Sequence, residues 1–129
     1  MALTSQEMVK AAEAQIETMD IDTAMASVED NSLTFVDIRD IRELWREGKI
    51  TGATHAPRGM LEFWIDPSSP YHRELFAADK KFVFYCASAW RSALATLTAQ
   101  QMGLKACHIA GGFTAWKEAR GPIEDVQKK

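Results

Sequence analysis

The chain has 129 residues, enough for one domain with its own hydrophobic core and too few for two domains of ordinary size. Hydrophobic residues make up 47% and charged residues 26%, as in soluble globular proteins, and 15 basic against 18 acidic side chains give a net charge of −3. Without a basic excess we expect no nucleic-acid partner, and no apolar run approaches the roughly 18 residues that a membrane span needs.

The first twenty residues carry charged side chains throughout, which argues against the apolar segment of a secretory signal. The chain has two cysteines, which cannot build a disulfide framework. We therefore expect a cytoplasmic protein with free thiols, and neither a membrane nor nucleic acid as its partner.

The N-terminal segment predicts a helix over residues 5–18. Thr4 and Glu7 have the spacing of a capping box, and apolar residues follow Val9 at helical intervals. A second, short helix is expected over residues 22–28, with Asp22 as its cap.

The next segment predicts a buried strand over residues 33–38, followed by a helix over 40–45 that Asp40 caps and Gly48 stops. A short strand is expected over residues 53–55. Residues 58–79 have the weakest pattern, with one helix predicted over 60–65 and another over 72–78.

Residues 81–86 give the clearest strand signal, because four consecutive apolar residues are typical of a central parallel strand that is buried on both faces. Three further elements are predicted after it: a helix over 90–102, a strand over 106–109 and a helix from 111–112 to 119. Regular structure is expected to end at 121–122. This alternation predicts an α/β domain with a mostly parallel sheet of about five strands and helices on both faces.

Ligands of such sheets bind beyond the carboxyl ends of the strands, where the strand order reverses. Cys86 is the last residue of the clearest strand, and the residues that lead from it into the next helix are Ala87, Ser88, Ala89, Trp90, Arg91 and Ser92. Small side chains let this backbone curl so that its N–H groups form a nest for an anion, to which the helix N-terminus contributes. A lone cysteine is commonly inert packing, but this pattern favours a reactive thiolate at Cys86.

Three separated stretches carry a resemblance to a known family. They are "FVDIRDIRELWREGKITGATHAP" at 35–57, "YCASAWRSA" at 85–93 and "GGFTAWKEARGPIE" at 111–124. Together, in this order and at this spacing, they resemble a single-domain rhodanese, a sulfurtransferase. The resemblance implies a rhodanese-like domain over residues 21–124, an N-terminal helical extension over 1–20 and a frayed tail over 125–129.

The resemblance further implies that Cys86 takes a sulfur atom from a small anionic donor such as thiosulfate and becomes a persulfide. The sulfur then passes to cyanide or a thiol. Alternatively, the domain is a carrier that delivers the sulfur to another protein. Arg91 either holds the donor or braces the loop, and Ser92 either donates its hydroxyl toward the sulfur or caps the helix. No cofactor is implied.

Cysteine phosphatases of related architecture are the closest rival. They have five residues between cysteine and arginine, which makes room for a phosphoryl group, whereas four residues separate Cys86 from Arg91. The shorter loop favours a single sulfur atom. Ala89 stands where many members of the family have glycine, so a positive φ there would strain it. Trp90 either walls the pocket or packs on a neighbouring loop.

Several other residues have less specific interpretations. We expect Asp37 and Arg39 to be structural, and Arg58 either to add charge at the pocket rim or to be solvated. Cys107 is expected to be inert, with a disulfide to Cys86 as the alternative. The remaining expectations concern aromatic and imidazole side chains: a core position for Phe113 and Trp116, an exposed ring at Phe63 or Trp64, and no metal site at His55, His72 and His108.

Overall fold

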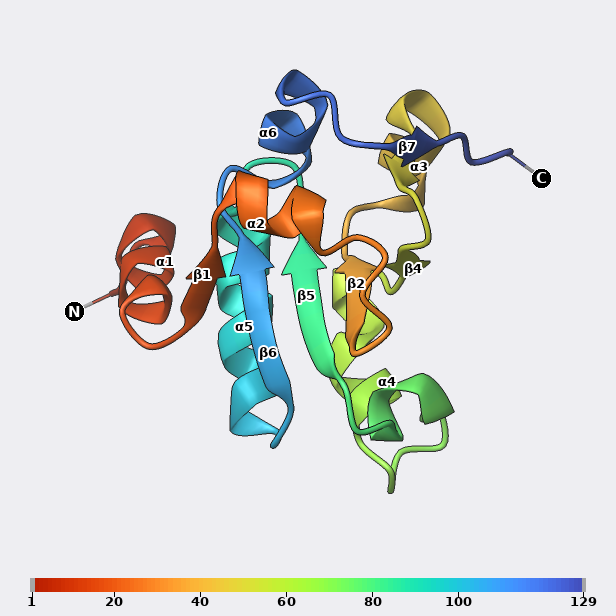
Figure 1. Cartoon of the computed structure of the whole chain (residues 1–129). Helices are drawn as coiled ribbons and strands as arrows, with labels where there is room; N and C mark the ends of the chain where they lie inside the picture. Colours follow the sequence, from red (N-terminus) through yellow and green to blue (C-terminus); the bar gives the residue numbers. More distant parts are fainter. Residues whose placement is uncertain (1, 129) are drawn as a thin grey trace.

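The computed structural model describes residues 2–128. Its centre is a five-stranded sheet with the order β1-β6-β5-β2-β4, in which every neighbouring pair is parallel (Figure 1). The strands are β1 (Glu17–Met19), β2 (Leu33–Asp37), β4 (Thr54–His55), β5 (Lys81–Tyr85) and β6 (Lys105–Ile109). The predicted α/β architecture with a central parallel sheet is confirmed.

Helices cover both faces of the sheet. They are α1 (Ser5–Glu13), α2 (Ile21–Ala26), α3 (Ile41–Glu47), α4 (Leu61–Ile65), α5 (Trp90–Gln101) and α6 (Gly112–Glu118), with 3₁₀ turns η1 (Arg58–Met60) and η2 (Glu74–Ala77). Helices α4 and α5 pack on one face, with α1 alongside α5, whereas α2 and α6 pack on the other (Figure 1). Within residues 2–128, the helices are all too short or too polar to cross a bilayer.

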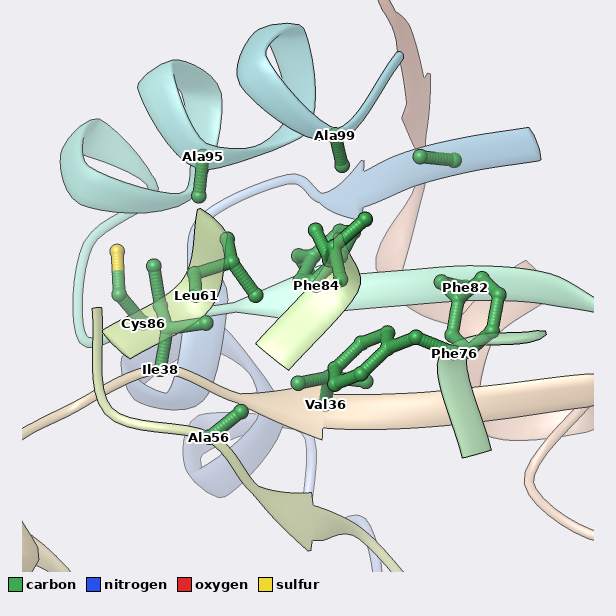
Figure 2. Packing of buried hydrophobic residues seen from close by; sticks show 12 residues of the cluster. Val36, Ile38, Ala56, Leu61, Phe76, Phe82, Phe84, Cys86, Ala95 and Ala99 are labelled. Carbon is green, nitrogen blue, oxygen red and sulfur yellow. The ribbon is translucent and has the colours of Figure 1, made fainter. Parts of the chain in front are cut away.

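The central strand β5 shows why the sheet is buried on both faces. Phe82, Phe84 and the following Cys86 belong to the hydrophobic cluster under α4 and α5, part of which Figure 2 shows. Val83 and Tyr85 belong to the cluster under α2 and α6. Because successive side chains of a strand point to opposite faces, a continuous apolar run supplies both layers of the core.

The N-terminal segment differs from the helix predicted over residues 5–18. The capping box of Thr4 and Glu7 is present, but the helix ends at Glu13 rather than at residue 18. The chain then forms β1, an edge strand that pairs with β6. Three residues carry too little periodicity to distinguish a strand from a helix end, and the pairing partner is distant in sequence. Helix α2 is capped by Asp20, whose Oδ1 accepts from the N–H of Thr23 at 2.8 Å.

The C-terminal segment contains a second strand pair that the sequence did not predict. Strand β7 (Ile123–Glu124) runs antiparallel to β3 (Lys49–Ile50), so regular structure continues past 121–122. Gly48 makes this contact possible: its φ is +79°, and a Cβ there would lie 2.7 Å from the carbonyl oxygen of Glu124. The predicted helix over 72–78 is the shorter 3₁₀ turn η2.

Candidate active site

The strand order reverses between β2 and β5. From β2 the chain crosses to β4 at one edge of the sheet, whereas β5 lies on the other side of β2 and leads on to β6. The crevice that such a reversal opens at the carboxyl ends of the strands is the usual ligand site of an open parallel sheet. Cys86 directly follows β5 at this point.

Helix α6 fixes the loop that follows Cys86. The carbonyl of Cys86 accepts from the N–H of Phe113 at 2.8 Å, and that of Ala87 accepts from Thr114 at 3.1 Å. Gly112, with φ +59°, allows this approach, because a Cβ there would lie 2.5 Å from the Cys86 carbonyl oxygen. In a trans peptide the N–H points opposite to the C=O, so the N–H groups of residues 87 and 88 point away from α6.

The sulfur of Cys86 lies at the end of the core beside the first turn of α5 (Figure 2). The residue is 1% exposed, and the N–H of Ser92 donates to Sγ at 3.3 Å. Among residues 2–128, the N–H groups of 87–91 have no hydrogen-bond acceptor. The sulfur therefore accepts one N–H at the N-terminus of α5, the end of a helix that carries partial positive charge.

Ala89 adopts the conformation for which glycine is common. Its φ is +74°, in the left-handed region, immediately before α5. The strain that the sequence indicated for this position is therefore present.

Replacing Ala89 by glycine is expected to raise the free energy of unfolding by about 1 kcal/mol, because glycine adopts a positive φ without a clash of its Cβ. Urea unfolding of the two proteins measures the difference. Ala11→Gly, at an exposed position within α1, is the matched control and should lower the stability by a similar amount. A loss of stability in both variants would contradict the presence of strain at Ala89.

Arg91 braces the loop. Its Nη1 and Nη2 donate to the two carboxylate oxygens of Glu43 at 2.9 and 3.0 Å, which connects α5 to α3 across the crevice. This contact lowers the pKa of Glu43 and raises that of Arg91, and the nearby Cys86 sulfur contributes a smaller part of the rise at Arg91. Arg91 thus holds the two sides of the crevice together and also presents positive charge toward the sulfur.

Ser92 fulfils neither of the two roles proposed for its hydroxyl. Its Oγ pairs with Nδ1 of His108 at 2.9 Å, and Nε2 of that ring pairs with Oγ1 of Thr18 at 3.1 Å. This network, which is buried at Ser92 and His108 and reaches the surface at Thr18, joins β1 and β6 to the residue whose N–H contacts Cys86. The sequence could not reveal it, because its three members are separated along the chain and have no shared motif.

Burial lowers the pKa of His108 from its ordinary value of 6.5, with Glu13 opposing the shift. The unfolded chain therefore binds a proton below pH 6.5 that the folded chain does not yet bind. Stability should fall as the pH drops from 6.5 toward the folded pKa, by at most about 1.4 kcal/mol per pH unit. Urea titrations at pH 7.5 and pH 5.5 should show a smaller loss in His108→Gln than in the wild-type protein. Equal losses of stability in the two proteins would mean that His108 does not cause this pH dependence.

Asp37 and Arg39 form a fully buried ion pair at the end of β2, which agrees with the expected structural role. Arg39 Nη2 donates to Asp37 Oδ2 at 2.8 Å and to the carbonyl of Gly48 at 2.7 Å. The guanidinium also lies over the ring of Phe113, 4.1 Å from its centroid. The pair therefore supports the start of α6, which in turn holds the carbonyls of the Cys86 loop.

Cys107 lies on the opposite face of the sheet from Cys86. It pairs with Val83, three residues before Cys86, and belongs to the cluster under α2 and α6. Three residues of strand span roughly 10 Å, too far for a disulfide, so the proposed alternative of a bridge to Cys86 is wrong. Burial raises the pKa of Cys107 to about 11, which agrees with an inert thiol.

The remaining candidates are one arginine and several aromatic and imidazole side chains. Arg58, in η1, donates to Glu62 Oε1 of α4 at 2.8 Å, and a role for its charge at the pocket rim stays a prediction. Phe113 and Trp116 are buried, and of the pair Phe63 and Trp64 it is Phe63 that is exposed. In residues 2–128 no three His, Cys, Asp or Glu side chains gather as metal ligands would.

The chain belongs to the rhodanese-like domain family, which matches residues 20–119. It is 30% identical over 93 residues to a protein of Bacillus subtilis (strain 168) named "Putative sulfurtransferase YtwF", which covers 72% of this chain and 82% of that protein.

Two solved structures are also similar. One, from Rhodopseudomonas palustris CGA009, has 52% identity and a TM-score of 0.93, covers 96% of each chain, and is described as a protein of unknown function and "Possible Tyrosine Phosphatase". The other is the polysulfide-sulfur transferase homodimer of Wolinella succinogenes, with 30% identity and a TM-score of 0.68, covering 93% of this chain and 86% of that one.

Proposed function

We propose that the protein is a sulfurtransferase that carries sulfur as a persulfide on Cys86, with thiosulfate or a similar small anion as donor. The observation that carries the proposal is the position of the Cys86 sulfur, which receives the N–H of Ser92 and precedes a loop, residues 87–91, whose N–H groups have no acceptor within residues 2–128. These groups can stabilise a thiolate and, after transfer, the anionic outer sulfur of a persulfide. Membership of the rhodanese-like family supports the same chemistry.

The reaction has two steps. The Cys86 thiolate attacks the outer sulfur of thiosulfate, a new S–S bond forms, and the S–S bond of thiosulfate breaks, so that sulfite leaves with the electron pair. A cyanide ion or a thiolate then attacks the outer sulfur of the persulfide and releases the Cys86 thiolate. No net oxidant or reductant is needed. Arg91, whose guanidinium is held by Glu43, adds positive charge near the anionic donor without bonding it directly.

Phosphatase chemistry is the second candidate because of the description given to the Rhodopseudomonas palustris protein. The loop does not favour it. Four residues separate Cys86 from Arg91, and both guanidinium Nη atoms are bonded to Glu43 rather than directed together toward an anion. A transferred phosphoryl group needs several donors around its three oxygens, whereas sulfur transfer leaves only a single sulfur atom on Cys86, which needs fewer.

A role as a carrier between proteins differs from small-molecule turnover only in the partners. The free thiols of Cys86 and Cys107 support a reducing, cytoplasmic setting for either role. The steady-state rate with thiosulfate and cyanide distinguishes the two: rapid turnover supports the enzyme, and slow turnover with a stable persulfide supports the carrier.

Intact mass spectrometry after incubation with thiosulfate tests the proposal. We expect a gain of about 32 Da, one sulfur atom, that cyanide removes and that peptide mapping locates on Cys86. Cys107 provides an internal control, because it should carry no added sulfur. No mass gain, together with hydrolysis of a chromogenic phosphate ester, would refute sulfur transfer and favour phosphatase chemistry.

A further inference from the structure

The first turn of α5, which contacts the sulfur, begins without a side-chain cap. The residue before it is Ala89, whose methyl group cannot accept a hydrogen bond and whose φ is positive. The N–H groups of a first turn have no helical carbonyl to bond, so contacts with other elements have to hold its direction. On one side Arg91 pairs with Glu43 of α3. On the other side the hydroxyl of Ser92 pairs with His108 of β6.

The contact between Ser92 and His108 lies directly behind the sulfur. The N–H of Ser92 donates to Cys86 Sγ at 3.3 Å, and its Oγ lies 2.9 Å from Nδ1 of His108. Ser92 and His108 are 0% and 1% exposed, so water does not compete for this contact. His108 is the neighbour of Phe84 in the sheet, two residues before Cys86. One residue therefore bonds the sulfur through its backbone and the imidazole through its side chain.

The imidazole of His108 suits a bridge between two hydroxyl groups. Its pKa is lowered by burial, so the ring is neutral at pH 7 and has one donor and one acceptor nitrogen. Nε2 pairs with Oγ1 of the exposed Thr18 at 3.1 Å. An aliphatic side chain of similar size would fill the same space but would leave the buried hydroxyl of Ser92 without this partner, at a cost in free energy. Packing alone therefore does not account for an imidazole at this position.

Charged groups act on both ends of this network. Glu13 of α1 acts on the imidazole and opposes the effect of burial on its pKa. Arg91, whose guanidinium Glu43 holds, acts near the sulfur. Strand β5 places the apolar Phe84 beside His108. Variants of the network that introduce only uncharged side chains leave these charges in place and test the hydrogen bonds themselves.

We propose that His108 is a positioning residue for the reaction at Cys86: its Nδ1 holds the hydroxyl of Ser92 and thereby keeps the N–H of Ser92 directed at the thiolate. His108 acts through Ser92 and not on the sulfur donor. The inference rests on the proposed chemistry of Cys86 and adds to it a residue from another strand of the sheet.

The test is the pH dependence of the alkylation of Cys86 by iodoacetamide, read by peptide mapping. The midpoint is compared and not the rate, because access to a buried sulfur changes the rate at every pH alike. We expect His108→Leu and Ser92→Ala each to raise the midpoint by about one pH unit, a tenfold change in the ratio of thiolate to thiol, because the hydrogen bond to the charged sulfur is weakened. The double variant should show the same rise and not twice that rise, because both changes remove one contact.

Two further variants separate positioning from a merely structural role. His108→Asn keeps a polar atom where Nδ1 lies and should restore the wild-type midpoint. Thr96→Val is the matched control: this buried hydroxyl, one turn further along α5, contacts the carbonyl of Cys107 on β6 at 3.5 Å. Its loss should lower the stability in urea without moving the midpoint.

The proposal is overturned by an unchanged midpoint in Ser92→Ala and His108→Leu. A rise in Thr96→Val or in His108→Asn as large as that in His108→Leu overturns it as well. If His108→Leu does not fold, Ser92→Ala decides. Alkylation does not require sulfur transfer, so a chain that gains no sulfur from thiosulfate would refute the proposed function and leave this measurement valid. The two failures are therefore distinguishable.

Discussion

Cys86→Ser should reduce the rate of sulfur transfer from thiosulfate to cyanide by at least about a thousandfold, because a serine hydroxyl at neutral pH cannot replace a thiolate as the attacking and leaving group. The variant should also gain no mass with thiosulfate. The change removes the sulfur that contacts the Ser92 N–H but keeps a side chain of similar size, so the fold should persist. Circular dichroism and urea unfolding verify that it does.

Cys107→Ser is the control for this prediction. Its thiol is buried on the far face of the sheet, so the variant should retain the rate and the persulfide of the wild-type protein, with at most a loss of stability. Sulfur transfer that survives in Cys86→Ser and disappears in Cys107→Ser would place the reaction at Cys107 and contradict the proposed role of Cys86.

Arg39→Met should lower the free energy of unfolding by about 3–5 kcal/mol, because it leaves the carboxylate of Asp37 buried without its partner. It also removes the bond to the Gly48 carbonyl and the contact with Phe113, and it thereby loosens the support of the Cys86 loop. Urea unfolding measures the first effect, and thiosulfate turnover at a temperature where the variant remains folded measures the second.

Two comparisons make this prediction specific. Arg42→Met removes a similar arginine–aspartate contact, with Asp40, that is exposed at the surface, and it should be almost indistinguishable from the wild-type protein. The double variant Asp37→Asn, Arg39→Met has no orphaned buried charge and should be more stable than Arg39→Met alone. A double variant as unstable as the single one would show that the lost packing, rather than the unpaired charge, dominates.

The features that the sequence predicted depend on neighbouring residues. The strand that leads into Cys86, the tight loop and the following helix lie within one continuous segment, so composition and spacing indicate them together. The strain at Ala89 was indicated by the resemblance to the rhodanese family, because alanine stands there where many members have glycine. The alternation of apolar and helical segments was enough to predict the layered sheet.

What the sequence did not predict depends on residues that meet only after folding. The partner of the Ser92 hydroxyl is His108, and the partner of Arg91 is Glu43, which lies 48 residues earlier. Strand β1 has three residues and β7 has two, too few to show a period. Charged and polar side chains at such positions have many potential partners, and only the topology of the sheet decides which one is in reach.

The place of β1 at the edge of the sheet has a consequence for how the chain folds. Its neighbour in the sheet is β6, and Thr18 meets His108 across 90 residues of sequence. During synthesis, α1 and β1 are made well before β6. Strand β1 therefore has no strand to pair with until β6 has been synthesised. Contacts this distant in sequence form slowly, so the opening segment, α1 with β1, is expected to dock on the domain last.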